Sequence, residues 1–494
     1  YDSDGAPASI GTGSALVDPA GNTIGERVTI PVIRNQTYFA RVVGNDPTAV
    51  NVYNLTAINV PAPVPQLVDL TAATDSGRHD SDDVTNFDAN LNGAAVFDIV
   101  LDDDRIDEFT NLNMVADTTD DDSQTVGADY GVEVFNNGVS IGFAFLTGGN
   151  TWQFTATNGD LVEGHNNFIS AAVWVRDAAD PEVIGRGELS GTLQVTLDTV
   201  ALPVSILGID PTLSDTGVAG IPSTLADNIT SVTAPGFTGD AEANAIVRLF
   251  VDATNDNAID NPTEFKLTTA LPNDGDEVFA TGQWTTAYDY NLNDPAAPNS
   301  FPHDGIREIS VTAEDLAGNV SAAENIDIFI DTQGPQVTDV FITSTPTFNL
   351  FGLKPTAAPT PLVSSITIDI QDLPARDAAF LYNALAEGTS FNPAENVGNY
   401  SLVGDYNGKI EITSAVFTPV TPTAGANATG SIELTFSAPL PDDRFTLTLS
   451  DKLVDPAGNA LDGESDAVEP DGSPIAGRLP SGDEQPGGDF VARF

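Results

Sequence analysis

The chain has 494 residues, with 72 acidic and 17 basic side chains, a formal net charge of −55 and no cysteine. Such a charge excludes nucleic acid and anionic membrane surfaces as partners and makes divalent cations the natural ones. Neither disulfides nor thiolate metal sites can stabilise the chain, and the sequence has no apolar run of about 20 residues that would predict membrane insertion.

The distribution of apolar residues predicts an all-β protein. Hydrophobic residues make up 41% of the chain, which is enough for folded domains. Short alternating runs of Val, Ile, Leu and Phe stand between turns rich in Gly, Pro, Asn and Asp. Residues 374–387 have apolar side chains at helical spacing, so we expect one short helix there. The length predicts roughly three to four domains.

Residues 1–63 contain three runs with strand character, at residues 28–32, 38–44 and 52–56. Tyr-Phe-Ala-Arg-Val-Val-Gly, followed by Tyr-Asn-Leu-Thr, resembles the end of a pre-peptidase C-terminal domain, a small β-sandwich of secreted bacterial proteins. Because the segment is short for such a domain, we expect its first strands to be missing or to come from another chain. A stiff, proline-rich linker follows at residues 60–65.

Residues 64–200 and 201–335 repeat one another. Each copy has a Trp strand, then an alternating strand that ends in Asp, then a strand that closes on Asp-Thr. The distance from Trp152 to Asp198 is 46 residues, and from Trp284 to Asp331 it is 47. A register held across three elements predicts tandem β-sandwich modules. We expect both Trp side chains in the sandwich cores.

The second copy reads Asp-Leu-Ala-Gly-Asn-Val-Ser at residues 315–321 and closes on Asp331 and Thr332. This pattern resembles the bacterial Ig-like domains of very large secreted and surface-anchored proteins. The first copy departs from it with Asp-Ala-Ala-Asp-Pro at residues 177–181. The resemblance implies a tandem array of Ig-like β-sandwich domains, and such arrays usually act as spacers.

Residues 336–494 form a different module, with strands expected at residues 365–370, 432–437 and 445–450. Asp-Pro-Ala-Gly-Asn-Ala-Leu-Asp-Gly at residues 455–463 resembles the Ig-like type found in S-layer proteins. The chain begins within strand-like sequence and ends in a strand-like run, so we expect it to be a processed product or a piece of a longer protein.

One candidate calcium loop lies in the second copy. Asp252, Thr254, Asp256 and Asp260 occupy positions 1, 3, 5 and 9 of a loop, which is the order of a calcium loop because Ca²⁺ takes six to eight oxygen ligands. The sixth position, where such loops need Gly, is Asn257. The alternative is a solvated turn.

A second set of acidic residues recurs at equivalent places in the two copies. Asp-Ser-Gly at residues 75–77 corresponds to Asp-Thr-Gly at residues 215–217, and Asp198 and Asp331 close the modules. We expect each closing Asp to approach the acidic start of the following module, where calcium would offset charge repulsion and stiffen the joint. The alternative is that these side chains only cap turns. The candidate ligands are Asp69, Asp75, Asp82, Asp83, Asp198, Asp215, Asp227 and Asp331.

The sequence gives no sign of catalysis. The three His residues lie far apart, and neither a G-x-S-x-G motif nor a Gly-rich phosphate loop is present. Trp174 is a candidate contact residue instead, because it aligns with the polar Thr312 on the face opposite the apolar side chains. The alternative for Trp174 is local packing.

These observations predict an extracellular, non-enzymatic structural protein, a calcium-stiffened component of a bacterial surface layer, stalk or filament. Its expected partners are divalent cations and copies of itself or neighbouring surface proteins. An adhesin or carbohydrate-binding protein and a non-catalytic fragment of a giant secreted hydrolase are the alternatives. For assembly, we expect the end of the chain, with Phe490 and Phe494, to complete the first sandwich of a neighbour, and Trp174 to make a lateral contact.

Overall fold

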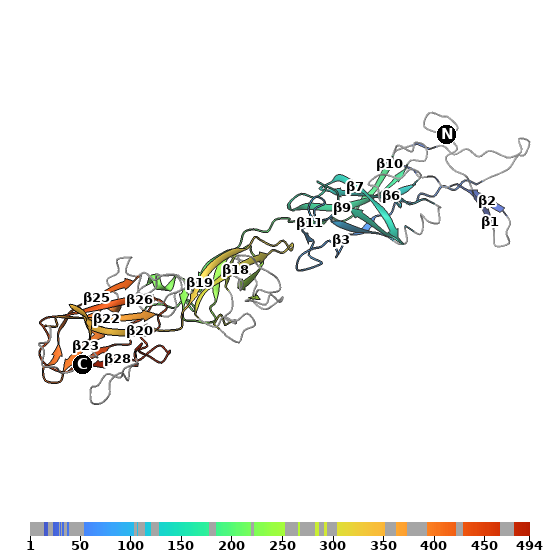
Figure 1. The fold of residues 1–494 in the computed structure, drawn as a ribbon. Helices are drawn as coiled ribbons and strands as arrows, with labels where there is room; N and C mark the ends of the chain where they lie inside the picture. The colour runs from blue at the N-terminus through green and yellow to red at the C-terminus, as the bar shows by residue number, and fades with distance from the viewer. Residues whose placement is uncertain are drawn as a thin grey trace, which may run out of the picture. The chain divides into compact units, whose positions relative to one another are not determined.

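The fold is taken from a computed structural model of the chain (Figure 1). The residues that it describes are 14–17, 23–28, 30, 32–33, 37–38, 54–102, 106, 114–119, 128–176, 184–218, 222–251, 265–266, 282–285, 291–293, 304–350, 362–372, 393–420, 428–464 and 479–494. The expected helix at residues 374–387 lies outside them. Within the described ranges, no helix has the length and hydropathy needed to cross a membrane.

The chain divides into two compact units. The first consists of Tyr1–Ala201 and Glu314–Val320, and the second of Leu202–Ala313 and Ser321–Phe494. Regular structure is almost entirely β-strand in both. Beyond a helical turn at Ile106, the described helical segments are the short 3-10 helices η1 (Pro222–Leu225), η4 (Pro393–Glu395) and η5 (Val397–Asn399).

The first unit contains a hairpin and a nine-stranded sheet that folds over itself. The long strand β7 pairs with β6 through its first half and with β8 through its second, so it joins two layers. The strand order is β3-β5-β8-β7-β6-β9-β11-β4, with β10 paired to β9. The strands are β1 (Ser14–Val17) and β2 (Thr23–Arg27) in the hairpin, then β3 (Pro65–Leu70), β4 (Val84–Thr85), β5 (Val96–Leu101), β6 (Tyr130–Asn136), β7 (Val139–Gly148), β8 (Thr151–Thr155), β9 (Gly164–Arg176), β10 (Ile184–Leu189) and β11 (Leu193–Leu197).

The second unit begins with a sandwich of two sheets. Its three-stranded sheet has the order β12-β14-β17, and its five-stranded sheet the order β13-β19-β18-β15-β16. This two-sheet arrangement with crossovers is that of an Ig-like sandwich. The strands are β12 (Ser205–Ile209), β13 (Ile229–Thr230), β14 (Phe237–Asp240), β15 (Ile246–Val251), β16 (Phe265–Lys266), β17 (Gln283–Thr285), β18 (Gly305–Glu314) and β19 (Glu324–Ile330).

A second sandwich completes this unit. One sheet has the order β21-β20-β22-β26-β25 and the other β24-β23-β27-β28. The predicted all-β tandem array of Ig-like sandwiches is therefore confirmed. The strands are β20 (Gln336–Ile342), β21 (Thr345–Asn349), β22 (Ser365–Asp372), β23 (Tyr400–Gly404), β24 (Gly408–Ile410), β25 (Ile412–Val420), β26 (Ala428–Phe436), β27 (Phe445–Leu449) and β28 (Phe490–Arg493).

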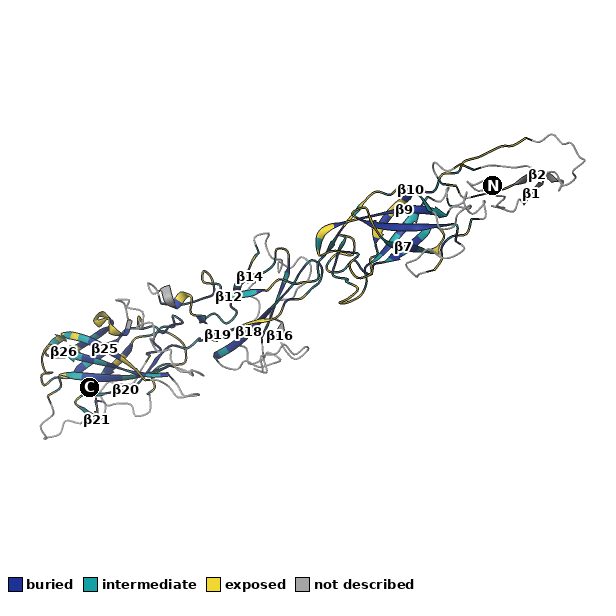
Figure 2. Cartoon of the chain, turned by 90° about the horizontal axis from the view of Figure 1, so that it is seen from above, coloured by how far each residue is buried: buried dark blue, intermediate teal, exposed yellow. Residues whose placement is uncertain are grey.

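In most strands of the sandwiches every second residue is buried, which places a core between the layers (Figure 2). Strand β26 alternates buried and half-buried residues along its whole length. Trp152 and Trp284 are buried in two of the cores, as the sequence predicted. Trp152 stacks obliquely on Tyr130, with 5.9 Å between ring centroids.

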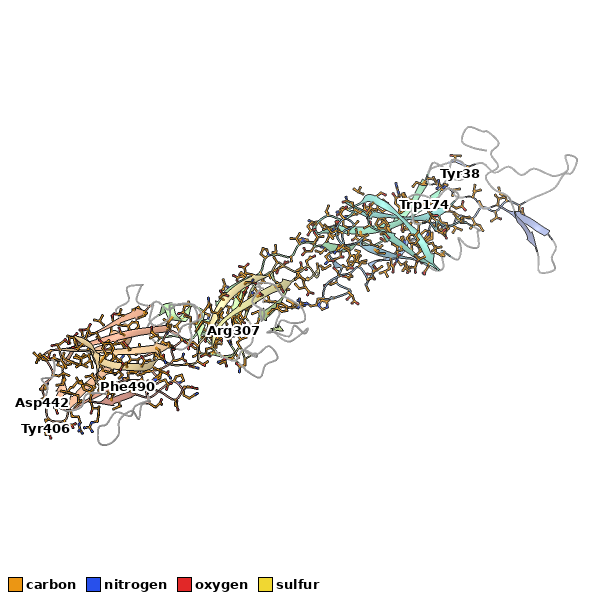
Figure 3. All side chains as sticks on the ribbon, in the orientation of Figure 1. Tyr38, Trp174, Arg307, Tyr406, Asp442 and Phe490 are labelled. Atoms are coloured by element: carbon orange, nitrogen blue, oxygen red, sulfur yellow. The ribbon has the colours of Figure 1, made fainter. Side chains whose placement is uncertain are left out.

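The prediction that Trp174 is an exposed contact is wrong, because its side chain is 0% exposed. Its ring lies over Gly131 of the neighbouring strand, where a Cβ atom would come within 2.6 Å of it, so the glycine makes the room. Phe143 meets the ring edge-on at 6.4 Å, and the Arg176 guanidinium lies 5.4 Å from its centre. Trp174 is labelled in Figure 3. Local packing, the alternative, accounts for Trp174.

The predicted donation of the last strand to a neighbour is also wrong. Strand β28 pairs with β27 of its own module, and Phe490 is 0% exposed in that module's core. Phe494 exchanges two backbone hydrogen bonds with Phe445. A strand that is paired within its own sheet is not available for donation to a neighbour, and Phe490 is a core residue of its own module.

The strands expected in residues 1–63 find little support. The described residues near residues 28–32 and at residues 54–60 have no regular structure, and most of residues 38–53 lies outside the described ranges. The described strand pair is β1 with β2, at a place the sequence analysis did not single out. The pre-peptidase resemblance is not confirmed.

Candidate cation site at the module junctions

Two loops with the sequence Asp-x-Ala-Gly-Asn fold in the same way, at residues 315–319 and 455–459. In each, the residues just outside are paired, Glu314 with Val320 and Val454 with Ala460. In each, the backbone N–H of the Asn donates to Oδ1 of the loop's Asp at 2.8 Å. The Gly has a left-handed φ, 88° at Gly318 and 85° at Gly458. The aspartate thus closes the turn, and glycine permits it.

Each loop sits on a three-residue segment, which we call a head, at residues 75–77 or 215–217. Ser76 Oγ donates to the carbonyl of Ala317 at 2.6 Å, and Thr216 Oγ1 donates to that of Ala457 at 2.6 Å. We call these two contacts the first and second junctions. The first lies within the first compact unit and the second within the second unit.

The loop asparagine also joins each loop to the closing Asp of the module that carries the head. Nδ2 of Asn319 donates to the Asp198 carbonyl at 2.8 Å, and Nδ2 of Asn459 donates to the Asp331 carbonyl at 2.9 Å. The same nitrogen also donates to the aspartate of its own loop. Both amide hydrogens are therefore used, which an Asp or Ala at this position could not reproduce.

Glycines let head and loop approach backbone to backbone. A Cβ atom on Gly77, whose φ is 88°, would lie 1.8 Å from the Leu316 carbonyl oxygen. A Cβ atom on Gly458 would lie 2.9 Å from the Gly217 carbonyl oxygen. Because a carbonyl cannot yield as a flexible side chain can, larger residues would separate the loop from its head.

Three carboxylates converge at the second junction. Asp331 follows β19, Asp372 ends β22, and Asp455 begins the loop; all three are buried, and one ligand oxygen from each lies within 4.8 Å of the others. Asp331 belongs to the predicted ligand set, whereas the sequence analysis did not propose Asp372 or Asp455. The residue types fit a hard divalent cation, which prefers carboxylate oxygens.

The electrostatics of this cluster are unfavourable to three bare negative charges. Burial, followed by the charge of Asp455 and then of Asp372, raises the pKa of Asp331 well above its usual value. Burial likewise raises the pKa of Asp455, although hydrogen bonds from Asn459 act against it. A buried carboxylate favours either a proton or a cation, because ionisation without one is costly in a low dielectric.

The first junction has a smaller acidic group. Burial raises the pKa of Asp198, and the charges of Asp315 and Glu163 add to that effect. Asp315 is buried, but Asp198 is only half-buried and Glu163 is exposed. Glu163 also accepts hydrogen bonds from the amide and hydroxyl of Thr199 at 3.0 Å. Water can therefore screen this group better than the second cluster.

Two aspartates inside the heads have buried carboxylate oxygens without a hydrogen-bond partner, although Oδ2 of Asp75 accepts from the amide of Asp83 at 3.2 Å. Neither carboxylate oxygen of Asp215 has a partner of normal geometry, and Oδ1 of Asp75 has none, although both residues are only 6% exposed. Burial raises the pKa of each to about 6. At Asp75 the charges of Asp82 and Asp83 add to this effect. These two residues remain candidate ligands.

The other predicted ligands that the structure describes cap turns or lie near another acidic side chain. Asp82 and Asp227 each accept from the amide two residues further on, at 3.2 and 3.0 Å, which is the capping alternative. Burial, followed by the charges of Asp69 and Asp82, raises the pKa of Asp83, and Asp69 itself is exposed on β3. The loop containing Asp252, Thr254, Asp256 and Asp260 lies outside the described residues.

A second acidic trio, Asp462, Glu464 and Asp483, also has ligand oxygens within 4.8 Å of one another. Here Asp462 accepts hydrogen bonds from the amides of Asp483 and Glu484, both at 3.0 Å, and from Gln336 Nε2 at 2.9 Å. Because these donors already stabilise its charge, this trio has less need of a cation than the junction cluster.

Sequence reasoning missed most of the junction residues. It used the loops at residues 315–319 and 455–459 only as marks of family resemblance, although their shared Asp-x-Ala-Gly-Asn pattern was the available signal. Their role as contacts depends on the heads, which lie 241 residues earlier in the chain in both junctions. Asp372 is part of an ordinary strand sequence, and no local signal marks it.

No family model and no curated protein matches the chain. Among solved structures, it is similar to a tetra-tandem repeat in the extending region of a large adhesion protein, at 14% identity over 81% of this chain and 72% of that one, with a TM-score of 0.21. It is also similar to fibronectin(III)-like modules of Clostridium thermocellum CbhA, at 12% identity over 53% and 94% of the chains, with a TM-score of 0.22. A complex of Dpr2 Ig1-Ig2 with DIP-Theta Ig1-Ig3 matches at 10% identity over 75% and 92%, with a TM-score of 0.22.

Proposed function

We propose that the chain is a non-catalytic structural segment of an extracellular surface protein, a component of a surface layer, stalk or filament whose module junctions bind a divalent cation, calcium foremost. The observation that supports this most directly is the repetition of one contact. Loop and head meet through the same atoms, 241 residues apart in sequence, in both junctions. Modules that contact mainly their neighbours form arrays, and such arrays serve as spacers or supports.

The cation part of the proposal is supported by the cluster of Asp331, Asp372 and Asp455. Each carboxylate can offer two oxygens, and calcium binds six to eight at flexible geometry. Cation binding would replace the mutual repulsion that raises the pKa of Asp331. The ion would tie a residue after β19 to residues from two other parts of the same unit, so it would resist their separation.

The alternative of a carbohydrate-binding surface protein loses its aromatic candidate. A protein of that kind should display an exposed aromatic side chain, whereas Trp174, the predicted contact residue, is buried against Phe143 and Arg176. A structural role needs no such platform, so it is the function that we favour.

Calorimetry of the full chain with free calcium and with excess chelator tests the proposal. At free calcium about a hundred times the dissociation constant, a single site stabilises its folded unit by about 2.7 kcal/mol. We expect Asp372→Asn to remove most of the calcium-induced shift. Asp483→Asn, in the other acidic trio, should leave the shift intact. Identical melting curves with calcium and with chelator would show that the cation proposal is wrong.

A further inference from the structure

We propose that each head is a docking surface specific for an Asp-x-Ala-Gly-Asn loop, and that at the second junction this contact fixes how one sandwich of the second unit follows the other even without a cation. The partner is thus defined by its chemistry. It is a tight turn that offers the carbonyl of its Ala and the side-chain amide of its Asn, and it has Gly, with no side chain, at its fourth position. The inference shares with the proposed function the premise of an ordered array, but it does not depend on calcium.

The first step of the argument is that the head is preorganised by its own module. The amide of Asn86 donates to Ser76 Oγ at 2.8 Å, and the amide of Ser231 donates to Thr216 Oγ1 at 2.8 Å. With its acceptor role already filled, the hydroxyl has its hydrogen left to point at the loop. A donor held in place before contact loses little entropy on binding.

The closing Asp is held in the same way. The amide of Asp198 donates to the Thr85 carbonyl and that of Asp331 to the Thr230 carbonyl, both at 2.8 Å. These bonds extend the parallel pairings of β4 with β11 and of β13 with β19. The carbonyl of each closing Asp is thereby presented to the loop asparagine at a fixed distance from the head hydroxyl.

The loop is preorganised as well, and its shape selects its sequence. Ala317 and Ala457 are both 0% exposed, so a larger side chain at that position has no room. Asparagine is required because its Nδ2 serves the loop's own Asp and the closing Asp together. The second position is not selected, since it is Leu316 in one loop and Pro456 in the other.

The contact can be weak because head and loop belong to one chain. Each junction has a hydroxyl bond from head to loop and a side-chain amide bond from the loop asparagine to the closing Asp. Two hydrogen bonds are too few to join separate molecules stably. Within one chain, however, the contact is intramolecular, and preorganised groups lose little entropy when they meet.

One more segment of the chain has the Asp-x-Ala-Gly-Asn sequence. Residues 16–22 read Leu-Val-Asp-Pro-Ala-Gly-Asn, identical to residues 453–459. Val17 pairs with Thr23, as Val454 pairs with Ala460. Residues 18–22 lie outside the described residues, so this match concerns sequence and flanking strand pairing alone.

The test uses the full chain, which has no native cysteine to interfere with labelling. Spin labels on Leu207→Cys and Val416→Cys, both exposed positions of the second unit, report the distance across the second junction. In excess chelator we expect a single narrow distance distribution. Pro456→Leu, which gives the second loop the sequence of the first, should keep it narrow.

Two variants are expected to break the contact. Asn459→Asp removes the donor to the Asp331 carbonyl, and Gly458→Ala places a Cβ atom against Gly217. Both should broaden the distribution, while circular dichroism shows that the sheets remain folded. Gly408→Ala, at a left-handed glycine with open space around it, should leave it narrow.

Two outcomes would overturn the proposal. One is a narrow distribution that survives both Asn459→Asp and Gly458→Ala in folded protein. The other is a distribution that is broad in chelator before any substitution and narrows only with calcium. The second outcome would leave the cation proposal standing, whereas failure of calcium to stabilise the chain would leave the docking proposal untouched.

Discussion

The two junctions share one geometry and differ in charge. In both, a head hydroxyl binds a loop carbonyl at 2.6 Å and a loop asparagine binds the carbonyl of a closing Asp. At the second junction, however, Asp331, Asp372 and Asp455 are all buried together. At the first, Asp198 is half-buried. The loop contact and the capacity for a cation are therefore separable properties of the same joint.

This difference assigns a separate cause to each property. The contact depends on backbone carbonyls, on one Ser or Thr hydroxyl and on one Asn side-chain amide, and none of these groups titrates near neutral pH. The cation capacity depends on how many carboxylates are taken out of water, which varies between the junctions. Changes to glycine or asparagine should affect both junctions, whereas changes to charge should affect mainly the second.

The largest effect is expected from filling the space between head and loop at the first junction. Gly77→Ala would place a Cβ atom 1.8 Å from the Leu316 carbonyl and would also strain a left-handed backbone. We expect a loss of about 3 kcal/mol or more in the free energy of unfolding, because backbone atoms must move. Chemical denaturation of the full chain measures it.

Gly159→Ala is the matched control for Gly77→Ala. Its φ is 89°, but no atom lies within 4 Å of an added Cβ, so it should cost only about 1 kcal/mol of left-handed strain. At the second junction, Gly458→Ala meets a carbonyl at 2.9 Å and should fall between the two. Equal costs for Gly77→Ala and Gly159→Ala would mean that the backbone approach contributes nothing.

The next largest effect is expected from removing the loop asparagine, and it should differ between the junctions because its partners are buried at the second and partly exposed at the first. Asn459→Ala leaves a buried carbonyl and a buried carboxylate oxygen without donors, which should cost about 2 kcal/mol. Asn319→Ala removes the same bonds where the groups are partly exposed, so about 1 kcal/mol is expected. Asn407→Ala, at an exposed turn, serves as the control. A larger loss at Asn319 than at Asn459 would contradict the comparison.

How much of this could be predicted from sequence depends on whether the cause is local. Periodic apolar residues and the spacing from each Trp to the closing Asp reveal the sandwiches, because strand burial follows a period of two. Asp331 was found because it closes a repeat. Asp372 was not, since only tertiary packing brings the end of β22 to the junction. Trp174 was misassigned because a glycine on the next strand, Gly131, makes the space that buries it.

A smaller effect should follow from removing one charge of the cluster. In chelator, Asp372→Asn reduces the repulsion on Asp331 and should raise the free energy of unfolding by about 1 kcal/mol. In calcium the same variant should lower it, because a ligand is lost. Calorimetry under both conditions measures this reversal of sign. A variant that is destabilised equally in both would indicate a packing role for Asp372.

The last effect expected is a dependence of stability on pH in chelator. The pKa of Asp331 is raised above its unfolded value, so the folded protein holds a proton that the unfolded chain has released. The contribution of that proton is fully present below the unfolded pKa, near 3.8, and is lost as pH rises through the folded pKa. Stability should therefore fall with rising pH, by at most about 1.4 kcal/mol per unit for this group.

Comparison of variants separates the pH-dependent contribution of Asp331 from those of other titrating groups. The difference in unfolding free energy between the unmodified chain and Asp331→Asn should change as pH rises from the unfolded pKa, near 3.8, through the raised folded pKa of Asp331. The corresponding difference for Asp198→Asn should change less over the same range, because Asp198 is half-buried. Calcium should flatten the dependence, since it competes with the proton for the same oxygens. A difference for Asp331→Asn that is constant across this range would mean that its carboxylate is ionised in the folded protein despite its neighbours. The second junction would then hold its charges without a proton, with hydrogen bonds such as those from Asn459 to Asp455 stabilising them.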